Sequence, residues 1–304
     1  MTGSPSPDQP PPDQESSDRL CLLTVHAHPD DESSKGPATV ARYAAEGVRT
    51  VLVCCTGGEE GDILNPAMDR PEVRAELPAV RAAELARAAE VIGYDEVVML
   101  GYRDSGMPDS PANAHPRCFA AADLDEATGR LVAEIRRVRP QVVITYNDDQ
   151  QGYPHPDHLR VHDISVLAFD RAGDPDAYPG TGSPWQPSKL YYSIWSRART
   201  EAIHQKFLEL GLESPFAEWW RDRPDQDHRV TTRVDISGHT DVRREALLSH
   251  ATQIDPESPF WFGLPTEVAR AIHPMDEYVL ARSLVDSPGP EDDLFAGLRE
   301  RAVR

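Results

Sequence analysis

The chain has 304 residues, which is long enough for one large α/β domain or two small ones, and 39% of the residues are hydrophobic. A formal net charge of −20 argues against binding to nucleic acid, because neutralising phosphates requires clustered lysine and arginine. Four cysteines without a C-x-x-C pattern predict no disulfide framework, and Cys21, Cys54 and Cys55, which lie in apolar runs, are expected to be buried thiols.

Residues 1–18 are rich in proline, serine, aspartate and glutamine. We expect this segment to be disordered, because it has almost nothing to bury. It also lacks the basic start and apolar stretch of a secretory signal, and no apolar run in the chain could span a bilayer. We therefore expect a cytoplasmic protein without membrane contacts, in which residues 19–304 form a single domain.

After this segment, apolar runs typical of buried strands alternate with stretches of helical periodicity. Strands are predicted over residues 20–26, 48–55, 96–100, 141–146, 189–195 and 229–236. Helices are predicted over residues 37–46, 72–92, 124–138, 156–171, 199–210 and 241–251. The alternation indicates an α/β fold that is Rossmann-like, with a doubly wound, mostly parallel sheet and helices on both faces. Ligands of such folds bind at the carboxyl ends of the strands.

Two short polar clusters follow two of these strands. Residues 27–32 read Ala-His-Pro-Asp-Asp-Glu, and residues 155–158 read His-Pro-Asp-His. Side chains at the exits of two strands can converge on one point, although many residues separate them. Two imidazoles and a carboxylate suit zinc or a similar divalent ion, and three protein ligands leave positions open for water and substrate. The clusters therefore predict a hydrolytic metalloenzyme with its metal site at the carboxyl ends of the strands.

The spacing within each cluster suggests how its side chains are used. His28 and Asp31 are three residues apart on a turn and can chelate one ion from the same side, while Asp30 can point toward a bound water. His155 and His158 straddle the predicted start of a helix. A single His-Pro-Asp sequence is common turn chemistry, but two such clusters after buried strands favour the metal site.

Other polar groups are expected around this site. A metal-bound imidazole is usually held through its other nitrogen, and Asp157 or Asp163 is available for that contact. The loop at residues 57–61 reads Gly-Gly-Glu-Glu-Gly, and its paired glutamates would repel phosphate. Its acidic side chains suit the hydroxyl and amine groups of a sugar, with a solvated loop as the alternative.

These motifs resemble those of the LmbE-like, or PIG-L, zinc-dependent N-deacetylases. The hallmarks of that family are A-H-P-D-D-E and a later H-P-D-H-x-x-x-H, matched here at residues 27–32 and 155–162. Segments 56–68, 104–106 and 250–256 are most similar to the branch of mycothiol S-conjugate amidases. That resemblance implies a small-molecule substrate in which an amide joins an S-substituted N-acetylcysteine to glucosaminyl-inositol. Cleavage would release a mercapturic acid and the amino-sugar-inositol.

The resemblance also implies roles for individual residues. It implies that one zinc or iron(II) ion per chain is held by His28, Asp31 and His158. Asp30 is then expected to act as general base and afterwards as general acid. His155, in its protonated form, is expected to stabilise the oxyanion, and Tyr153 to add a hydrogen bond to the same oxygen.

Further residues near the expected rim are candidates for binding the sugar and inositol hydroxyls. These residues are Lys35, Glu59, Arg81 and Asp104. For Lys35 the alternative is a solvated side chain at the start of a helix, where a cation is disfavoured. For Arg81 the alternative is an ion pair on a helix surface, with Glu84 or another nearby residue.

Three other functions stay open at this point. The chain could be a paralogue acting on a mycothiol-tagged intermediate of lincosamide-type antibiotic biosynthesis, or an N-acetylglucosaminyl-inositol deacetylase. It could also be a catalytically silent metal- or sugar-binding relative. Intact Asp30 and His155 argue against the silent relative, since binding alone needs neither. The sequence makes no prediction about the oligomeric state.

Overall fold

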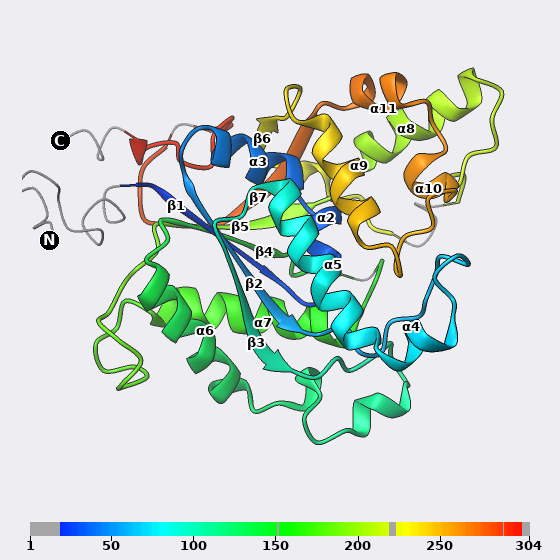
Figure 1. Ribbon diagram of the computed structural model, residues 1–304. Coiled ribbons are helices and arrows are strands. Elements are labelled where there is room, and N and C mark those ends of the chain that lie inside the picture. Colours follow the sequence, from blue (N-terminus) through cyan, green and yellow to red (C-terminus); the bar gives the residue numbers. More distant parts are fainter. Residues whose placement is uncertain (1–18, 151, 219–222, 288, 300–304) are drawn as a thin grey trace, which may run out of the picture.

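The computed structural model describes residues 19–150, 152–218, 223–287 and 289–299. The predicted disorder of residues 1–18 lies outside the described residues. A seven-stranded sheet with the order β3-β2-β1-β4-β5-β7-β6 forms the centre of the molecule (Figure 1). Its strands are β1 (Cys21–His26), β2 (Arg49–Thr56), β3 (Glu96–Tyr102), β4 (Val142–Tyr146), β5 (Lys189–Ile194), β6 (Thr232–Asp235) and β7 (Met275–Ser283).

The sheet is mostly parallel, which confirms the predicted fold class. Strands β1 to β5 pair in parallel, while β7 is antiparallel to both β5 and β6. From β1 the chain proceeds outward to β2 and β3, and from β4 it proceeds the other way to β5. The carboxyl ends of β1 and β4 therefore flank the point where the strand order reverses, which is where open α/β sheets bind ligands.

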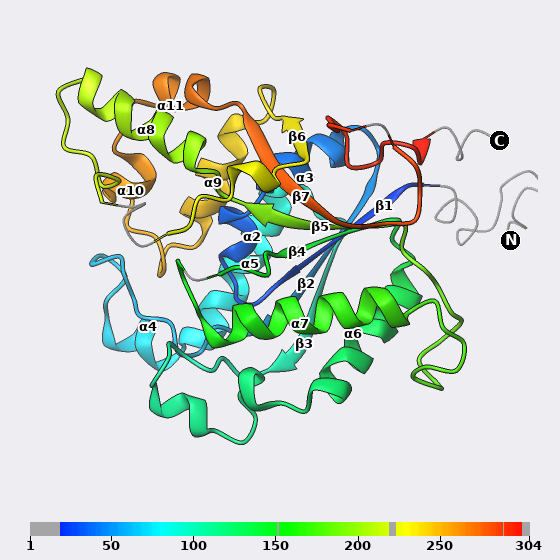
Figure 2. The same cartoon turned by 180° about the vertical axis from the view of Figure 1, so that it is seen from behind.

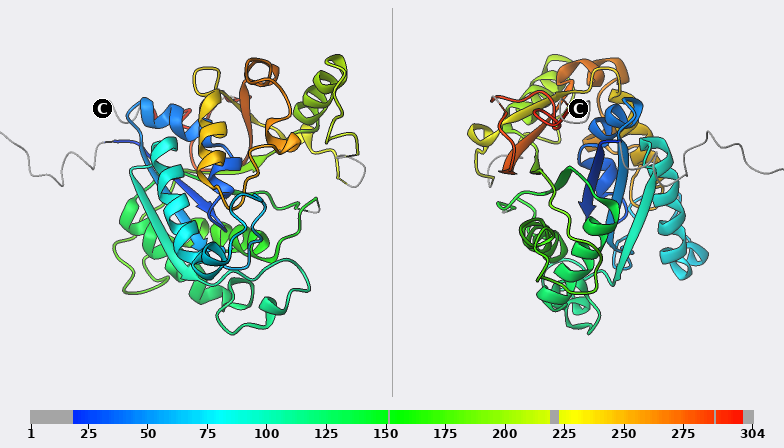
Figure 3. Two further views of the ribbon diagram at one scale, coloured as in Figure 1. Left: turned by 45° about the vertical axis from the view of Figure 1, so that its right-hand side comes forward. Right: turned by 90° about the vertical axis from the view of Figure 1, so that its left-hand side faces the viewer.

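Helices cover both faces of the sheet. One face is covered by α6 and α7, and the other by α3, α5 and α9 (Figures 1 and 2). Figure 3 shows the sheet between these layers from the side. The helices are α2 (Asp31–Ser34), α3 (Pro37–Ala45), α4 (Pro71–Ala75), α5 (Leu77–Ile92), α6 (Leu124–Val138), α7 (Pro156–Arg171), α8 (Arg197–Glu209), α9 (Thr240–Ser249), α10 (Pro259–Phe262) and α11 (Thr266–Ile272).

Apolar side chains fill the space on both faces of the sheet. Val25 packs with Leu131 of α6 on one face, and Leu22 packs with Tyr43 of α3 on the other. All four cysteines are buried and free; burial was predicted for Cys21, Cys54 and Cys55 but not for Cys118. Within the described ranges, the structure contains no helix long and apolar enough to cross a membrane.

Two sequence predictions about the fold were incomplete. The single helix expected over residues 72–92 is two helices, α4 and α5, which break at Glu76 because Pro78 near the start of α5 has no amide hydrogen to continue the first helix. Strand β7 was not predicted, because Asp276 and Glu277 near its start leave it an apolar run of only four residues, 278–281. Both carboxylates are buried and paired with cations, Asp276 with Arg243.

Candidate metal centre and active site

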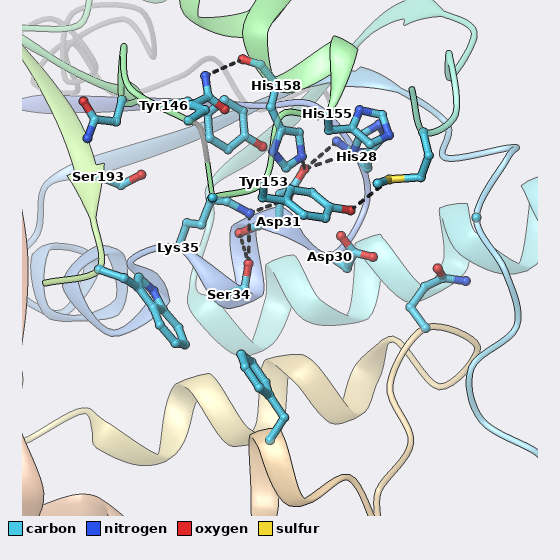
Figure 4. Close-up of a pocket in the computed structure, with 18 of the residues that line it drawn as sticks. His28, Asp30, Asp31, Ser34, Lys35, Tyr146, Tyr153, His155, His158 and Ser193 are labelled. Carbon is cyan, nitrogen blue, oxygen red and sulfur yellow. Dashed lines mark hydrogen bonds and ion pairs between the residues drawn. The ribbon is translucent and has the colours of Figure 1, made fainter. Parts of the chain in front are cut away.

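The two polar clusters meet at the carboxyl ends of β1 and β4. His28 and Asp31 lie just after β1, and His155 and His158 lie at the start of α7, which follows β4. Ligand nitrogens of the three histidines lie within 4.8 Å of one another. Figure 4 shows these imidazoles pointing toward one another, with Asp31 beside them. The predicted convergence of the two clusters is therefore confirmed.

A tight turn directs the first cluster into the site. Asp30 has a φ of 119°, in a region that non-glycine residues rarely occupy. Its amide donates a hydrogen bond to Glu32 Oε2 at 2.9 Å, and the amide of His28 donates to Asp31 Oδ2, also at 2.9 Å. Such backbone strain is maintained at functional sites when the surrounding contacts fix it. The turn places the Asp31 carboxylate beside His158 and the carboxylate of its neighbour Asp30 beside Arg81.

The donor atoms of His28, Asp31 and His158 fit a tetrahedral metal ion. Asp31 Oδ2 lies 3.3 Å from His28 Nδ1 and 3.4 Å from His158 Nε2. Ligand atoms bonded to a tetrahedral zinc ion at about 2.0–2.1 Å lie about 3.3–3.4 Å from one another. The three residues are each less than one-tenth exposed. These spacings suit the predicted ligand set, which also has the two imidazoles and one carboxylate typical of such sites.

Asp157 supports the imidazole of His28 from the side opposite Asp31. His28 Nε2 lies 3.2 Å from Asp157 Oδ2 and 3.4 Å from Asp104 Oδ1. Asp157 is fully buried and also accepts hydrogen bonds from the amide and hydroxyl of Ser105. Asp163, the other residue predicted for this contact, is exposed. A carboxylate that holds the second nitrogen of a ligating histidine fixes its orientation and raises its basicity.

The charges around the cluster also call for a cation. Four carboxylates and two basic groups surround the histidines: Asp30, Asp31, Asp104 and Asp157, and Lys35 and Arg81. With neutral imidazoles this leaves two negative charges. Burial lowers the pKa of His28, but its carboxylate partners outweigh this and raise the pKa well above its usual value. Burial lowers the pKa of His158 to about 4, so its imidazole is neutral at pH 7, which is the form that binds a metal.

Asp30 is set apart from the predicted ligands by Arg81. The Arg81 guanidinium is 2% exposed and donates to Asp30 Oδ2 at 3.1 Å and to the carbonyls of Pro29 and Gly58 at 2.5 Å. Burial raises the pKa of Asp30 to about 6, against the opposing effect of Arg81. A Cβ on Gly58 or Gly61 would lie 2.3 Å from the guanidinium, so the glycines of this loop admit Arg81.

Several residues that hold this arrangement were not recognised from the sequence. His250 Nε2 lies 2.6 Å from Glu32 Oε1, and both side chains are buried. Glu84 accepts two hydrogen bonds from Thr252, which excludes the alternative of a surface ion pair between Glu84 and Arg81: both side chains are buried and face different partners. The only sequence signal for His250 was its place in segment 250–256.

His155 has its imidazole tautomer set by the start of α7. It is the N-cap of the helix, and its Nδ1 accepts a hydrogen bond from the amide of Asp157 at 3.2 Å. Burial and the neighbouring His28 lower the pKa of His155, although nearby carboxylates oppose this. The lowered pKa favours a neutral ring that carries its hydrogen on Nε2 and can still donate from that atom, and the expected role of His155 at the oxyanion stays a prediction.

Two tyrosines flank the imidazoles. The ring of Tyr146, the last residue of β4, stacks on His158 at a centroid distance of 4.5 Å, and its hydroxyl accepts from the amide of Ala27. The sequence did not single out Tyr146. Tyr153 is half exposed at 51%, and its hydroxyl donates to the sulfur of Met107 at 3.6 Å (Figure 4). Tyr153 thus borders the cluster, and its predicted role in oxyanion binding stays a prediction.

The four predicted substrate-binding residues divide into two groups. Lys35, Arg81 and Asp104 line the cavity beside the cluster, whereas Glu59 does not. The Glu59 carboxylate instead accepts a hydrogen bond from the amide of Asp104 at 2.9 Å, and its neighbour Glu60 lines the cavity. Lys35 Nζ lies 2.5 Å from Asp31 Oδ1, so its ammonium holds a predicted metal ligand. Its predicted contact with the sugar stays a prediction.

A cavity of about 720 Å³ opens beside these residues. This volume is typical of sites that enclose a drug-sized ligand. Carboxylates of the loops after β2 and β3 line one part, and aromatic side chains from α10 and from Trp195, which directly follows β5, line another. The site therefore offers a buried set of metal ligands, a carboxylate next to it and room for a substrate with polar and apolar portions.

Comparison with known proteins identifies relatives along most of the chain. The family model "PIG-L: GlcNAc-PI de-N-acetylase" matches residues 23–169. The mycothiol S-conjugate amidase of Streptomyces coelicolor is 46% identical over 294 residues, which cover 94% of this chain and 99% of that protein. The 1D-myo-inositol 2-acetamido-2-deoxy-alpha-D-glucopyranoside deacetylase of Geodermatophilus obscurus is 42% identical over 290 residues, covering 91% and 97% respectively.

Solved structures support the fold. The N,N'-diacetylchitobiose deacetylase of Pyrococcus horikoshii has a TM-score of 0.60 at 16% identity, covering 87% of this chain and 84% of that one. The 4-carboxy-2-hydroxymuconate hydratase of Pseudomonas putida has a TM-score of 0.58 at 18% identity, covering 88% and 99%. Because a hydratase shares the fold with a deacetylase, the fold alone does not determine the reaction, which has to be argued from the site.

Proposed function

We propose a substrate for this chain, which belongs to the PIG-L family: the amide of a mycothiol S-conjugate, cleaved between its N-acetylcysteinyl and glucosaminyl-inositol halves. The relatives are named amidases and deacetylases, and the chain is accordingly a metal-dependent hydrolase of amide bonds in the mycothiol pathway. The finer assignment is our proposal, since relatives of both kinds are similarly identical to this chain.

The size and the lining of the cavity support the choice of the S-conjugate as substrate. At about 720 Å³, with carboxylates in one part and aromatic rings in another, it suits a ligand with a polar sugar-inositol half and a thioether half. The acetyl group that a deacetylase removes is too small to occupy the part of the cavity that aromatic rings line. The amidase therefore accounts for the whole lining, whereas the deacetylase accounts only for its polar part.

Three residues would hold the metal ion, and we propose zinc for it. His28, Asp31 and His158 offer two imidazoles and a carboxylate at suitable spacings, and Asp157 keeps His28 in orientation. When bound, zinc supplies a Lewis acid for the amide carbonyl and lowers the pKa of a coordinated water toward neutrality.

The remaining chemistry is a transfer of protons by side chains. Asp30 takes a proton from the attacking water and gives it to the amide nitrogen as the C–N bond breaks, because the amine leaves only once its nitrogen is protonated. Arg81 holds one carboxylate oxygen of Asp30 and leaves the other for this exchange. His155 donates from Nε2 to the oxygen that becomes negative as the carbonyl carbon turns tetrahedral.

A side-by-side assay tests the proposed substrate. The metal-loaded protein is given an S-benzyl mycothiol conjugate and, separately, the N-acetylglucosaminyl-inositol, and kcat/KM is measured for each. We expect the S-conjugate to be cleaved with the higher kcat/KM. A higher kcat/KM on the N-acetyl sugar would assign the chain to the deacetylases, and no turnover of either would favour a silent relative.

A further inference from the structure

One wall of the cavity has no part in the hydrolysis described above. Trp195 directly follows β5, and Phe260 and Trp261 belong to α10. The Phe260 ring centroid lies 4.7 Å from that of Trp261, and the Trp195 centroid lies 6.1 Å from both. We call these three rings the aromatic wall. Each of them lines the cavity, so two distant chain segments build one apolar surface.

The aromatic wall is supported from behind but is not itself part of the core. Buried Phe216 packs against Phe260 at a centroid distance of 5.0 Å, and the Arg199 guanidinium lies 4.7 Å from the ring centre of Trp195. The three rings of the wall are only partly buried. They also border a second cavity of about 150 Å³. Large rings held in this way beside a cavity are typical of ligand sites.

The order of the strands places the wall on one side of the metal ligands. The ligands follow β1 and β4, which are central, while Glu60 and Asp104 follow β2 and β3 on one side and Trp195 follows β5 on the other. Figure 4 agrees: Ser193 near the end of β5 and Asp30 lie on opposite sides of Asp31. A substrate with its amide at the metal ligands thus has a polar wall at one end and an aromatic wall at the other.

We propose that the aromatic wall is the subsite for the S-substituent of the conjugate, and that it takes aromatic or extended apolar thioether groups. This inference rests on the proposed amidase function. The amine half of the substrate carries hydroxyls, which suit the carboxylates after β2 and β3. The acyl half then points toward β5, where an apolar substituent leaves water and an aromatic one makes ring contacts with the wall.

The test compares two substrates that differ only at sulfur, S-benzyl mycothiol and S-methyl mycothiol. The wild-type protein should show a kcat/KM at least tenfold higher for the benzyl conjugate. Trp261→Ala and Phe260→Leu should each reduce this benzyl-to-methyl ratio at least fivefold, mainly through the benzyl KM. The ratio does not depend on how much of a variant is folded, so partial unfolding cannot imitate the result.

Leu64→Ala is the matched control. Leu64 is 61% exposed and lines the same cavity from the loop after β2, a different chain segment from those that carry the three rings, so its truncation should leave the ratio unchanged. Equal losses on both substrates in the two wall variants, or a ratio near one in the wild type, would overturn the subsite while leaving the amidase function intact. Failure of the wild type to cleave either conjugate would instead overturn the proposed function.

A binding measurement adds a readout without turnover. N-acetyl-S-benzylcysteine, the expected acyl product, should quench the tryptophan fluorescence of the wild type in a saturable way. N-acetyl-S-methylcysteine should bind at least tenfold more weakly. Equal affinities for the two compounds would contradict the proposed subsite.

Discussion

Replacing Asp30 by asparagine separates metal binding from proton transfer. The amide keeps an oxygen that can accept the hydrogen bond from Arg81, so the turn and the three predicted ligands stay in place. Only the ability to take and return a proton is lost. General acid–base catalysis contributes about 10²–10⁴-fold, so kcat should fall by that factor, equivalent to about 2.7–5.5 kcal/mol.

The cost in stability should be much smaller. The hydrogen bond from Arg81 to Asp30 changes from charge-assisted to neutral, and the other two acceptors of Arg81 remain. A loss of about 1 kcal/mol in the free energy of unfolding follows, which lowers the Tm by about 2–4 °C in a large domain. Unfolding therefore cannot account for the lost turnover at 25 °C.

The assay measures kcat on S-benzyl mycothiol, metal content by elemental analysis and Tm by calorimetry. Asp176→Asn serves as the control, because it makes the same chemical change at an exposed carboxylate in the loop before β5. Near-wild-type kcat in metal-loaded Asp30→Asn would show that Asp30 is not the proton carrier. Loss of the metal in that variant would show that Asp30 is a ligand.

Three further outcomes are expected. Asp157→Asn should weaken metal affinity by about 10–100-fold in a chelator competition, while Asp163→Asn, at an exposed position, should leave it unchanged. A metal affinity of Asp157→Asn equal to that of the wild type would show that Asp157 does not support the metal site. Lys35→Met should lower kcat about tenfold on both the S-conjugate and the N-acetyl sugar, because its ammonium holds Asp31; a loss confined to the S-conjugate would support the predicted sugar contact instead. Burial opposes ionisation of Glu291, but its hydrogen-bonding partners hold its pKa below the usual value, so it adds stability above pH 4.5 that is lost as pH falls through the lowered pKa; the stability gap between wild type and Glu291→Gln should narrow from pH 6 to pH 3, and a constant gap would contradict this.

The sequence predicted the parts of the site that depend on local spacing. His28 and Asp31 share one turn, and His155 and His158 share the first turn of one helix, so their directions follow from backbone geometry. The parallel sheet then brings the two turns together, because strand ends meet at one edge. Apolar runs were enough to predict that sheet, except for β7, whose second and third residues are charged.

The supporting residues could not be predicted in the same way. Arg81 reaches Asp30 across 51 positions, and His250 reaches Glu32 across 218. A polar residue on a helix is usually exposed, so burial of Arg81 depends on glycines of another loop that leave room for its guanidinium. The aromatic wall has the same origin, since Trp195 follows β5, the other two rings belong to α10, and the three form no pattern in the chain.

The most direct test of the account asks which amide is cut and where the oxygen of water goes. A mycothiol S-conjugate contains the N-acetyl amide and the amide that joins cysteine to glucosamine. Turnover of S-benzyl mycothiol in ¹⁸O-water, followed by mass spectrometry, should show one ¹⁸O in the carboxylate of N-acetyl-S-benzylcysteine and none in the glucosaminyl-inositol. Release of ¹⁸O-labelled acetate with the cysteinyl-glucosamine amide intact would contradict it.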